Sequence, residues 1–170
     1  MTSCGPYWQA QNYTHMFDVQ DIRGPLPVKV LCPGSISDII DKTPDLSSFN
    51  YILRLSGLAN EYNCLQANYT VFAPSNKYIT DNNFIKNMDI NTARSIVKSC
   101  TVDNRITKAL LQSTPNFLLI TKNNPNNLNL QTISDVTQIC PNINFLEYDI
   151  EATNGMIHIV DKLIIPDVIL

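Results

Sequence analysis

The sequence contains two histidines, His15 and His158, and a carboxylate follows the second one three residues later, at Asp161. A histidine near a carboxylate can act as a general base, so this pair is the first candidate for catalysis. No nucleophile elbow, phosphate-binding loop or paired-acid motif accompanies it. His158 stands between two isoleucines, where we expect its ring to hydrogen-bond the backbone or a neighbouring side chain. The sequence therefore predicts no enzyme and no catalytic residue, and a hydrolase using His158 is the alternative.

The five cysteines are the other reactive side chains, and they are Cys4, Cys32, Cys64, Cys100 and Cys140. Their number is odd and no two have the spacing Cys-x-x-Cys, which predicts neither a complete disulfide framework nor a structural zinc site. Other metal ligands are not clustered either, so we expect no metal and no cofactor. No basic region followed by an apolar run comes after Met1, so we expect no signal peptide. Reduced, mostly buried thiols in a reducing compartment are the corresponding interpretation.

The composition limits the classes of partner. The chain has 170 residues, 44% of them hydrophobic and 16% charged, with a formal net charge of −3. This suits one folded domain. Lys and Arg are scattered with no run of three, so we expect no nucleic-acid partner. The most apolar stretch, residues 156–170, is interrupted by charged residues and a proline, so we expect no membrane span. Asn and Ile are abundant, as in proteins from AT-rich genomes such as those of some protists and large DNA viruses.

Residues 1–34 differ from the rest of the chain. The breakers Gly5-Pro6, Gly24-Pro25 and Pro33-Gly34 exclude long helices and strands there. Trp8 and other aromatic residues make a purely solvated tail unexpected. We therefore interpret residues 1–34 as an arm that packs on its own domain or on a partner, and Trp8 is a candidate binding residue.

From residue 35 the apolar pattern is first helical. Ser35 can cap a short helix that ends before Pro44, and a second helix carries an apolar stripe that ends near Gly57. A buried strand over residues 69–74 follows, then a helix capped by Ser75 or Asn76. A further helix begins near Asp89.

Beyond residue 106 the pattern predicts mainly strands, within residues 116–121, 128–136, 143–152, 156–160 and 163–165. Asn154-Gly155 is typical of a type I′ hairpin turn, which needs positive φ at both central residues. Helices first and strands later predict an α+β fold with an antiparallel sheet.

Two segments carry a family resemblance. The first is Thr70-Val71-Phe72-Ala73-Pro74-Ser75-Asn76, and the second, about 80 residues later, runs from Asp149 to Pro166 and includes Asn154, Gly155, His158 and Asp161. Together, in this order, they resemble the two signature blocks of the fasciclin family. The resemblance implies a fasciclin-like wedge over residues 35–170: a twisted antiparallel β-sandwich flanked by helices.

The signature residues have evident structural roles. Val71 and Phe72 suit a core strand, Pro74 stops it and Asn76 can cap the following helix. The signature therefore predicts the fold better than the function.

The resemblance also bears on partners. Animal adhesion members of the family have a Tyr-His pair that is associated with integrin binding, but Ser99 and Cys100 occupy the corresponding positions here. A second pair linked to integrins, Asp-Ile, is matched by Asp149-Ile150. Integrin recognition is thus doubtful, and Asp149 and Ile150 join Trp8 as candidate binding residues.

The sequence predicts a non-catalytic protein–protein interaction module. We expect it to be a structural component of a larger assembly, such as a large-DNA-virus particle, in the cytoplasm or in the virion, with neighbouring subunits as its partners. The alternative is a secreted or surface cell-adhesion module, which a missing leader peptide would allow. Two N-glycosylation patterns, at Asn12 and Asn68, matter only in that case.

Overall fold

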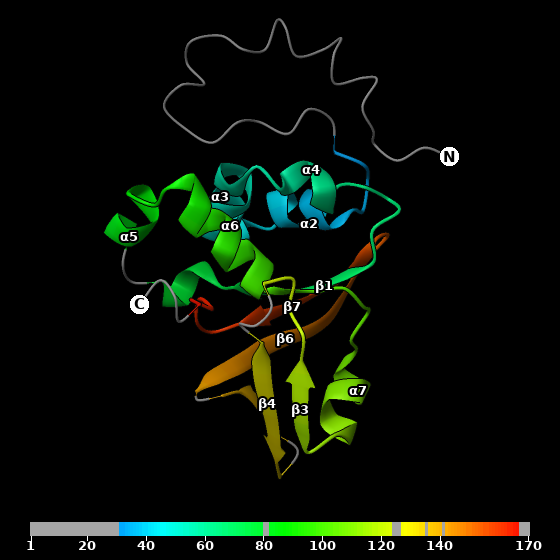
Figure 1. Cartoon of the computed structure of the whole chain (residues 1–170). Helices are drawn as coiled ribbons and strands as arrows, with labels where there is room; N and C mark the ends of the chain where they lie inside the picture. Colours follow the sequence, from blue (N-terminus) through cyan, green and yellow to red (C-terminus); the bar gives the residue numbers. More distant parts are fainter. Residues whose placement is uncertain (1–30, 80–81, 124–126, 135, 141, 167–170) are drawn as a thin grey trace, which may run out of the picture.

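The computed structural model describes residues 31–79, 82–123, 127–134, 136–140 and 142–166. Trp8 and nearly all of the predicted arm lie outside these residues. In the part described, α2 to α6 gather at one end of the molecule and the sheet forms the other end (Figure 1). The predicted α+β class is confirmed.

Six α-helices and two 3-10 turns are described. They are α2 (Ile36–Lys42), η2 (Pro44–Leu46), α3 (Ser47–Ser56), α4 (Ala59–Tyr62), η3 (Asn76–Tyr78), α5 (Asn82–Lys86), α6 (Ile90–Ser99) and α7 (Lys108–Ser113). The side chains of Ser35, Asp89 and Thr107 cap α2, α6 and α7 by accepting main-chain N–H groups. Gly57 ends α3 with a left-handed φ of 78°, as its place in the sequence predicts. The sequence did not predict α4 or α7.

The strands form a seven-stranded sheet in the order β2-β1-β7-β6-β5-β4-β3. They are β1 (Tyr69–Pro74), β2 (Thr101–Val102), β3 (Asn116–Leu119), β4 (Leu128–Ile133), β5 (Val136–Ile139), β6 (Ile143–Ala152) and β7 (Gly155–Val160). The prediction of a strand over residues 163–165 is wrong: these residues have no regular secondary structure and pair with no strand. A bridge between Val102 and Thr121 links the two ends of the sheet.

The sheet is mixed rather than wholly antiparallel. β1 runs parallel to β7, with Thr70 opposite Met156 and Ala73 opposite Ile159, while all other strand pairs are antiparallel. A parallel neighbour needs a long crossover connection, and here residues 75–154 provide it. Every residue of β7 is buried, so β7 is the central strand of the core.

The hairpin between β6 and β7 is confirmed, but the predicted type I′ turn is wrong. Ala152 pairs with Gly155, so Thr153 and Asn154 form the turn, and neither has positive φ. Gly155 is needed for another reason. A Cβ built on it would lie 2.0 Å from the carbonyl oxygen of Tyr69, closer than any real contact.

The side chain of Asn154 joins three parts of the fold. Its Oδ1 accepts the Ile36 N–H at 2.8 Å, and its Nδ2 donates to the carbonyl oxygens of Tyr62 (2.8 Å) and Cys64 (2.9 Å). Asn154 is 2% exposed, so water cannot replace these bonds. One buried amide thus holds the start of α2 and the end of α4 against the turn before β7.

Replacing Asn154 with Ala should destabilise the fold by about 3 kcal/mol, because two buried main-chain groups and one half-buried group lose their partners. Urea unfolding followed by circular dichroism measures the change. Asn129→Ala, at an exposed position of β4, is the matched control and should shift stability by less than about 0.5 kcal/mol. Equal effects of the two substitutions would contradict this role of Asn154.

Candidate functional site

His158 lies in the core with both ring nitrogens bonded to main chain. Its Nδ1 accepts the N–H of Asp149 at 3.1 Å, and its Nε2 lies 2.7 Å from the carbonyl oxygen of Ile106. Since Nδ1 accepts, Nε2 carries the proton and donates it to that oxygen, so the ring is neutral. The side chain has no exposed surface. It has no free nitrogen with which to act as a base.

Aromatic rings surround His158. Phe72 stacks on it at 5.6 Å between centroids, while Tyr148 at 5.8 Å and Phe145 at 6.0 Å meet it edge-on. Burial among these rings lowers the pKa of His158, although the hydrogen bond to Ile106 opposes the shift. The environment therefore favours the neutral ring in the folded protein.

The carboxylate of Asp161 binds Asn144 and not His158. It accepts the main-chain N–H of Asn144 at 2.9 Å and the Asn144 Nδ2 at 3.0 Å. These bonds lower the pKa of Asp161 despite partial burial, which alone would raise it. The carboxylate thus ties the end of β7 to the start of β6, and the acid-base pair that the spacing indicated has a separate role for each member.

One residue from each signature block hydrogen-bonds the same loop, the segment between β2 and α7. Thr70 donates its hydroxyl to the carbonyl oxygen of Asn104 and accepts the N–H of Ile106 at 2.8 Å. The carbonyl oxygen of Ile106 is the group that His158 binds. The segment between β2 and α7 is therefore fixed by one polar side chain from β1 and one from β7.

Asn76 has a different role from the predicted one. Ser75, not Asn76, caps η3, since its hydroxyl accepts the Lys77 N–H. Asn76 instead reaches α3, where its Oδ1 accepts the N–H of Ser48 at 2.9 Å and its Nδ2 donates to Ser47 Oγ at 2.6 Å. The end of β1 is thus tied to the start of α3.

The remaining signature residues lie in the core or at its margin. Val71, Phe72 and Ala73 are fully buried in β1. Pro74 pairs with Val160 at the end of the same ladder, and Pro166 is buried after β7. None of them presents a polar group for catalysis.

The candidate binding residues Asp149 and Ile150 lie at an irregularity of β6. Asp149 has positive φ (58°) and its exposed carboxylate accepts the N–H of Lys108, the first residue of α7, at 2.9 Å. Ile150 is half-buried and pairs with Ile157. Ser99 and Cys100 are both buried and unable to meet a partner at the surface. A binding role for Asp149 and Ile150 stays a prediction.

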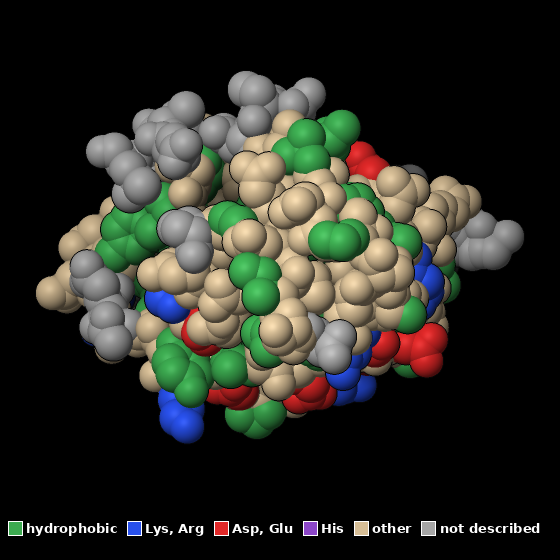
Figure 2. Space-filling view, turned by 90° about the horizontal axis from the view of Figure 1, so that it is seen from below, with side chains coloured by type: hydrophobic (Ala, Val, Ile, Leu, Met, Phe, Trp, Pro, Cys, Tyr) green, Lys and Arg blue, Asp and Glu red, His purple; other side chains and the backbone are tan. Residues whose placement is uncertain are grey.

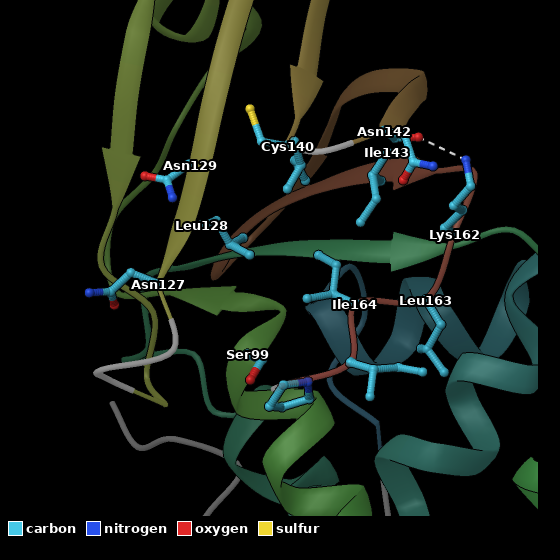
Figure 3. A pocket seen from close by; sticks show the side chains of 13 residues that line it. Ser99, Asn127, Leu128, Asn129, Cys140, Asn142, Ile143, Lys162, Leu163 and Ile164 are labelled. Atoms are coloured by element: carbon cyan, nitrogen blue, oxygen red, sulfur yellow. Dashed lines mark hydrogen bonds between the residues drawn. The ribbon is translucent and has the colours of Figure 1, made fainter. Parts of the chain in front are cut away.

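One hollow of about 560 Å³ lies between the sheet and the segment after β7. Leu128, Ile143, Leu163 and Ile164 line it, as Figure 3 shows, while the thiol of Cys140 points away. Lys162 lies at its margin and donates to the carbonyl oxygen of Asn142 at 2.8 Å. The lining contains no carboxylate and no histidine. Its chemistry suits apolar contact, and sequence patterns did not indicate it because the residues come from separate segments.

The cysteines are not all reduced. Cys32 is disulfide-bonded, whereas Cys64, Cys100 and Cys140 are free thiols. Burial raises the pKa of Cys100 to about 12, so this thiol is inert in the folded protein. The expectation of reduced thiols therefore fails at Cys32.

Among the described residues, no three His, Cys, Asp or Glu side chains lie together as a metal site requires. No helix in that part of the chain has the length and apolar character needed to cross a membrane.

The fold and the contacts of the signature residues define an α+β scaffold in which motif side chains hold helices to a central strand. The family model for the fasciclin domain matches residues 44–166, and the chain belongs to that family. The predicted fasciclin-like wedge is confirmed. Members of this family act as adhesion and protein-interaction modules.

A similar solved structure is a FAS1 domain pair from the insect cell adhesion molecule fasciclin I. It has a TM-score of 0.67 and 20% sequence identity, and the match covers 79% of this chain and 52% of that one. This chain thus spans about half the length of that structure. No curated protein matches the sequence.

The buried, neutral His158 should make stability fall as the pH drops below about 6.5. The unfolded chain takes up a proton near the ordinary pKa of 6.5, whereas the folded ring, with its lowered pKa, does not. The expected slope approaches about 1.4 kcal/mol per pH unit. Urea unfolding at a series of pH values from 7.5 to 5.0 measures it.

His158→Gln is the matched variant, since its amide can still donate a hydrogen bond but does not titrate. Its stability should be lower at neutral pH and should vary less between pH 6.5 and 5.0. The carboxylic acids with a shifted pKa, Asp38, Asp89 and Asp161, all have it lowered from 3.8 and act only below this window. An identical slope in the two proteins would contradict the assignment.

Proposed function

We propose that this chain is a non-catalytic module that binds other proteins through its surface. The observation that carries the proposal is the state of His158, whose ring nitrogens are both bonded to main chain inside the core. Other polar signature residues, among them Thr70, Asn154 and Asp161, likewise bond groups within the fold. The fasciclin signature is thus used for support, which leaves the exposed surface to select partners.

The first setting we propose is an assembly in which the chain is a structural component, such as a large-DNA-virus particle. Its support is the outer surface of β3, β4 and β5, where exposed apolar side chains are numerous. Ile133 and Val136, paired at the tip of the β4–β5 hairpin, are 62% and 59% exposed. Exposed apolar surface of this kind favours contact with a neighbouring protein.

The second setting is adhesion at a cell surface. The similar solved structure comes from a cell adhesion molecule, and Cys32 is disulfide-bonded, which favours an oxidising compartment. Asn68, in one of the two glycosylation patterns, is exposed just before β1. A partner bound near Asp149 and Ile150 belongs to this setting.

Cross-linking of native material followed by mass spectrometry tests the interaction function. Links between this chain and one recurring protein partner are expected, in assembled particles for the first setting and at the cell surface for the second. The matched variants are Ile133→Lys, at the hairpin tip, and Ile90→Lys, at another exposed position at the start of α6 (62% and 50% exposed). Only Ile133→Lys should reduce the assembly links, and recovery of the chain without any linked protein would contradict the proposal.

Intact mass separates the two settings. With thiols alkylated under denaturing conditions before any reduction, three adducts are expected, on Cys64, Cys100 and Cys140. Added glycan mass at Asn12 or Asn68 would favour adhesion after secretion. Five adducts without glycan would favour a reducing compartment and contradict the disulfide of Cys32.

A further inference from the structure

The free edge of the sheet is the strand β3. It is the last strand in the order, with β4 as its neighbour (Figure 1). On its other side, the described residues pair only just beyond the end of β3, where Thr121 bridges Val102 of β2. The helix α7, which Figure 1 draws beside β3, makes its main contacts to the sheet with β4 and β5. Over residues 116–119, β3 is thus an edge strand whose outer side pairs with no described strand.

The register identifies which main-chain groups face that edge. Pro115 accepts the N–H of Thr132, and in antiparallel ladders such bonded positions alternate. The main-chain groups of Phe117 and Leu119 therefore point toward β4, and those of Asn116 and Leu118 point away from it. Two N–H and two C=O groups are presented in the correct alternation for one more antiparallel strand.

The edge lacks the features that normally prevent such pairing. Edge strands of natural proteins are protected by charged side chains, internal prolines or bulges. Residues 116–120 have the sequence Asn-Phe-Leu-Leu-Ile, with no charge and no proline, and Leu118 is 55% exposed. Nothing in these five residues opposes the approach of another strand.

The adjoining sheet face is also uncharged. Asn116, Gln131, Gln138 and Asn144 stand opposite one another across four strands, and Gln138 donates to Asn144 at 2.6 Å. Figure 2 looks onto the end of the molecule where β3 and β4 have their tips, and uncharged side chains cover much of the surface there. Amide side chains both donate and accept, so a row of them can meet an identical row.

We propose that a second copy of this chain pairs with β3, so that two sheets join edge to edge about a two-fold axis. Asn116 of one copy then bonds Leu118 of the other, and the two Phe117 side chains face each other across the axis. The pairing is self-complementary, as a two-fold interface requires. Two chains of net charge −3 repel least where neither carries a charge, which favours this edge as the contact.

The interface is small. It buries less than the ~800 Å² per partner of a stable complex, so we expect a dissociation constant on the order of 10 μM. This dimer adds one named partner to the proposed binding of other proteins. Its test uses the purified chain alone, so a failure here leaves the proposed binding of other proteins standing.

Sedimentation velocity from about 1 to about 200 μM should show a concentration-dependent dimer. Leu118→Lys places a charge at the edge and should weaken dimerisation at least tenfold. Leu65→Lys, at an exposed leucine (41%) in the turn before β1, should leave it unchanged. A wild-type chain that stays monomeric throughout, or equal dimerisation of both variants, overturns the proposal.

Cysteine cross-linking tests the register in a Cys140→Ser background, which removes the exposed thiol. Phe117→Cys should form a covalent dimer under mild oxidation, because directly opposed, non-bonded positions are about 4.5 Å apart. Leu118→Cys should not, because its counterpart lies diagonally at about 7–8 Å. The reverse result overturns this register. Hydrogen exchange of the main-chain N–H groups of Asn116 and Leu118 in the monomer is a second test. Slow exchange there would mean that the chain covers its own edge, which also overturns the proposal.

Discussion

The fold depends on hydrogen bonds to the main-chain groups around β7, the wholly buried central strand. A strand enclosed on both faces brings the turn before it into the core as well, where an unpaired main-chain group is costly. The amide of Asn154 solves this at one end by serving three main-chain groups. Because those groups belong to α2, α4 and the following loop, the same side chain also sets where the helices lie on the sheet.

The same constraint explains a histidine inside an apolar core. His158 costs desolvation, but its two bonds satisfy the main chain of the β6 irregularity and of the loop before α7. A hydrophobic residue of equal size would fill the space and leave both groups unpaired. The ring is therefore best understood as a connector between β6, β7 and that loop, with Thr70 holding the same loop from β1.

The sequence predicted local features better than long-range ones. The cap at Ser35, the end of α3 at Gly57 and the strand over residues 69–74 follow from chemistry within a few neighbouring residues. The parallel pairing of β1 with β7 depends on contacts about 86 residues apart, which periodicity cannot reveal. Asn76 illustrates the same limit. Its residue type and its position after a strand predicted a local helix cap, but its hydrogen bonds reach α3, 28 and 29 residues earlier.

The candidate site could be predicted only in part, because the recognisable residues and the exposed ones are different sets. The signature made Thr70, Asn154 and His158 visible in the sequence, and each of them is buried. The hollow beside Ile164 and the uncharged edge of β3 contain no family motif. A partner can recognise only what a folded module exposes, so two chains sharing this signature can share a fold and still bind unrelated proteins. What distinguishes this chain among fasciclin domains must therefore lie in its exposed surfaces, such as the β3 edge with its apolar and amide side chains.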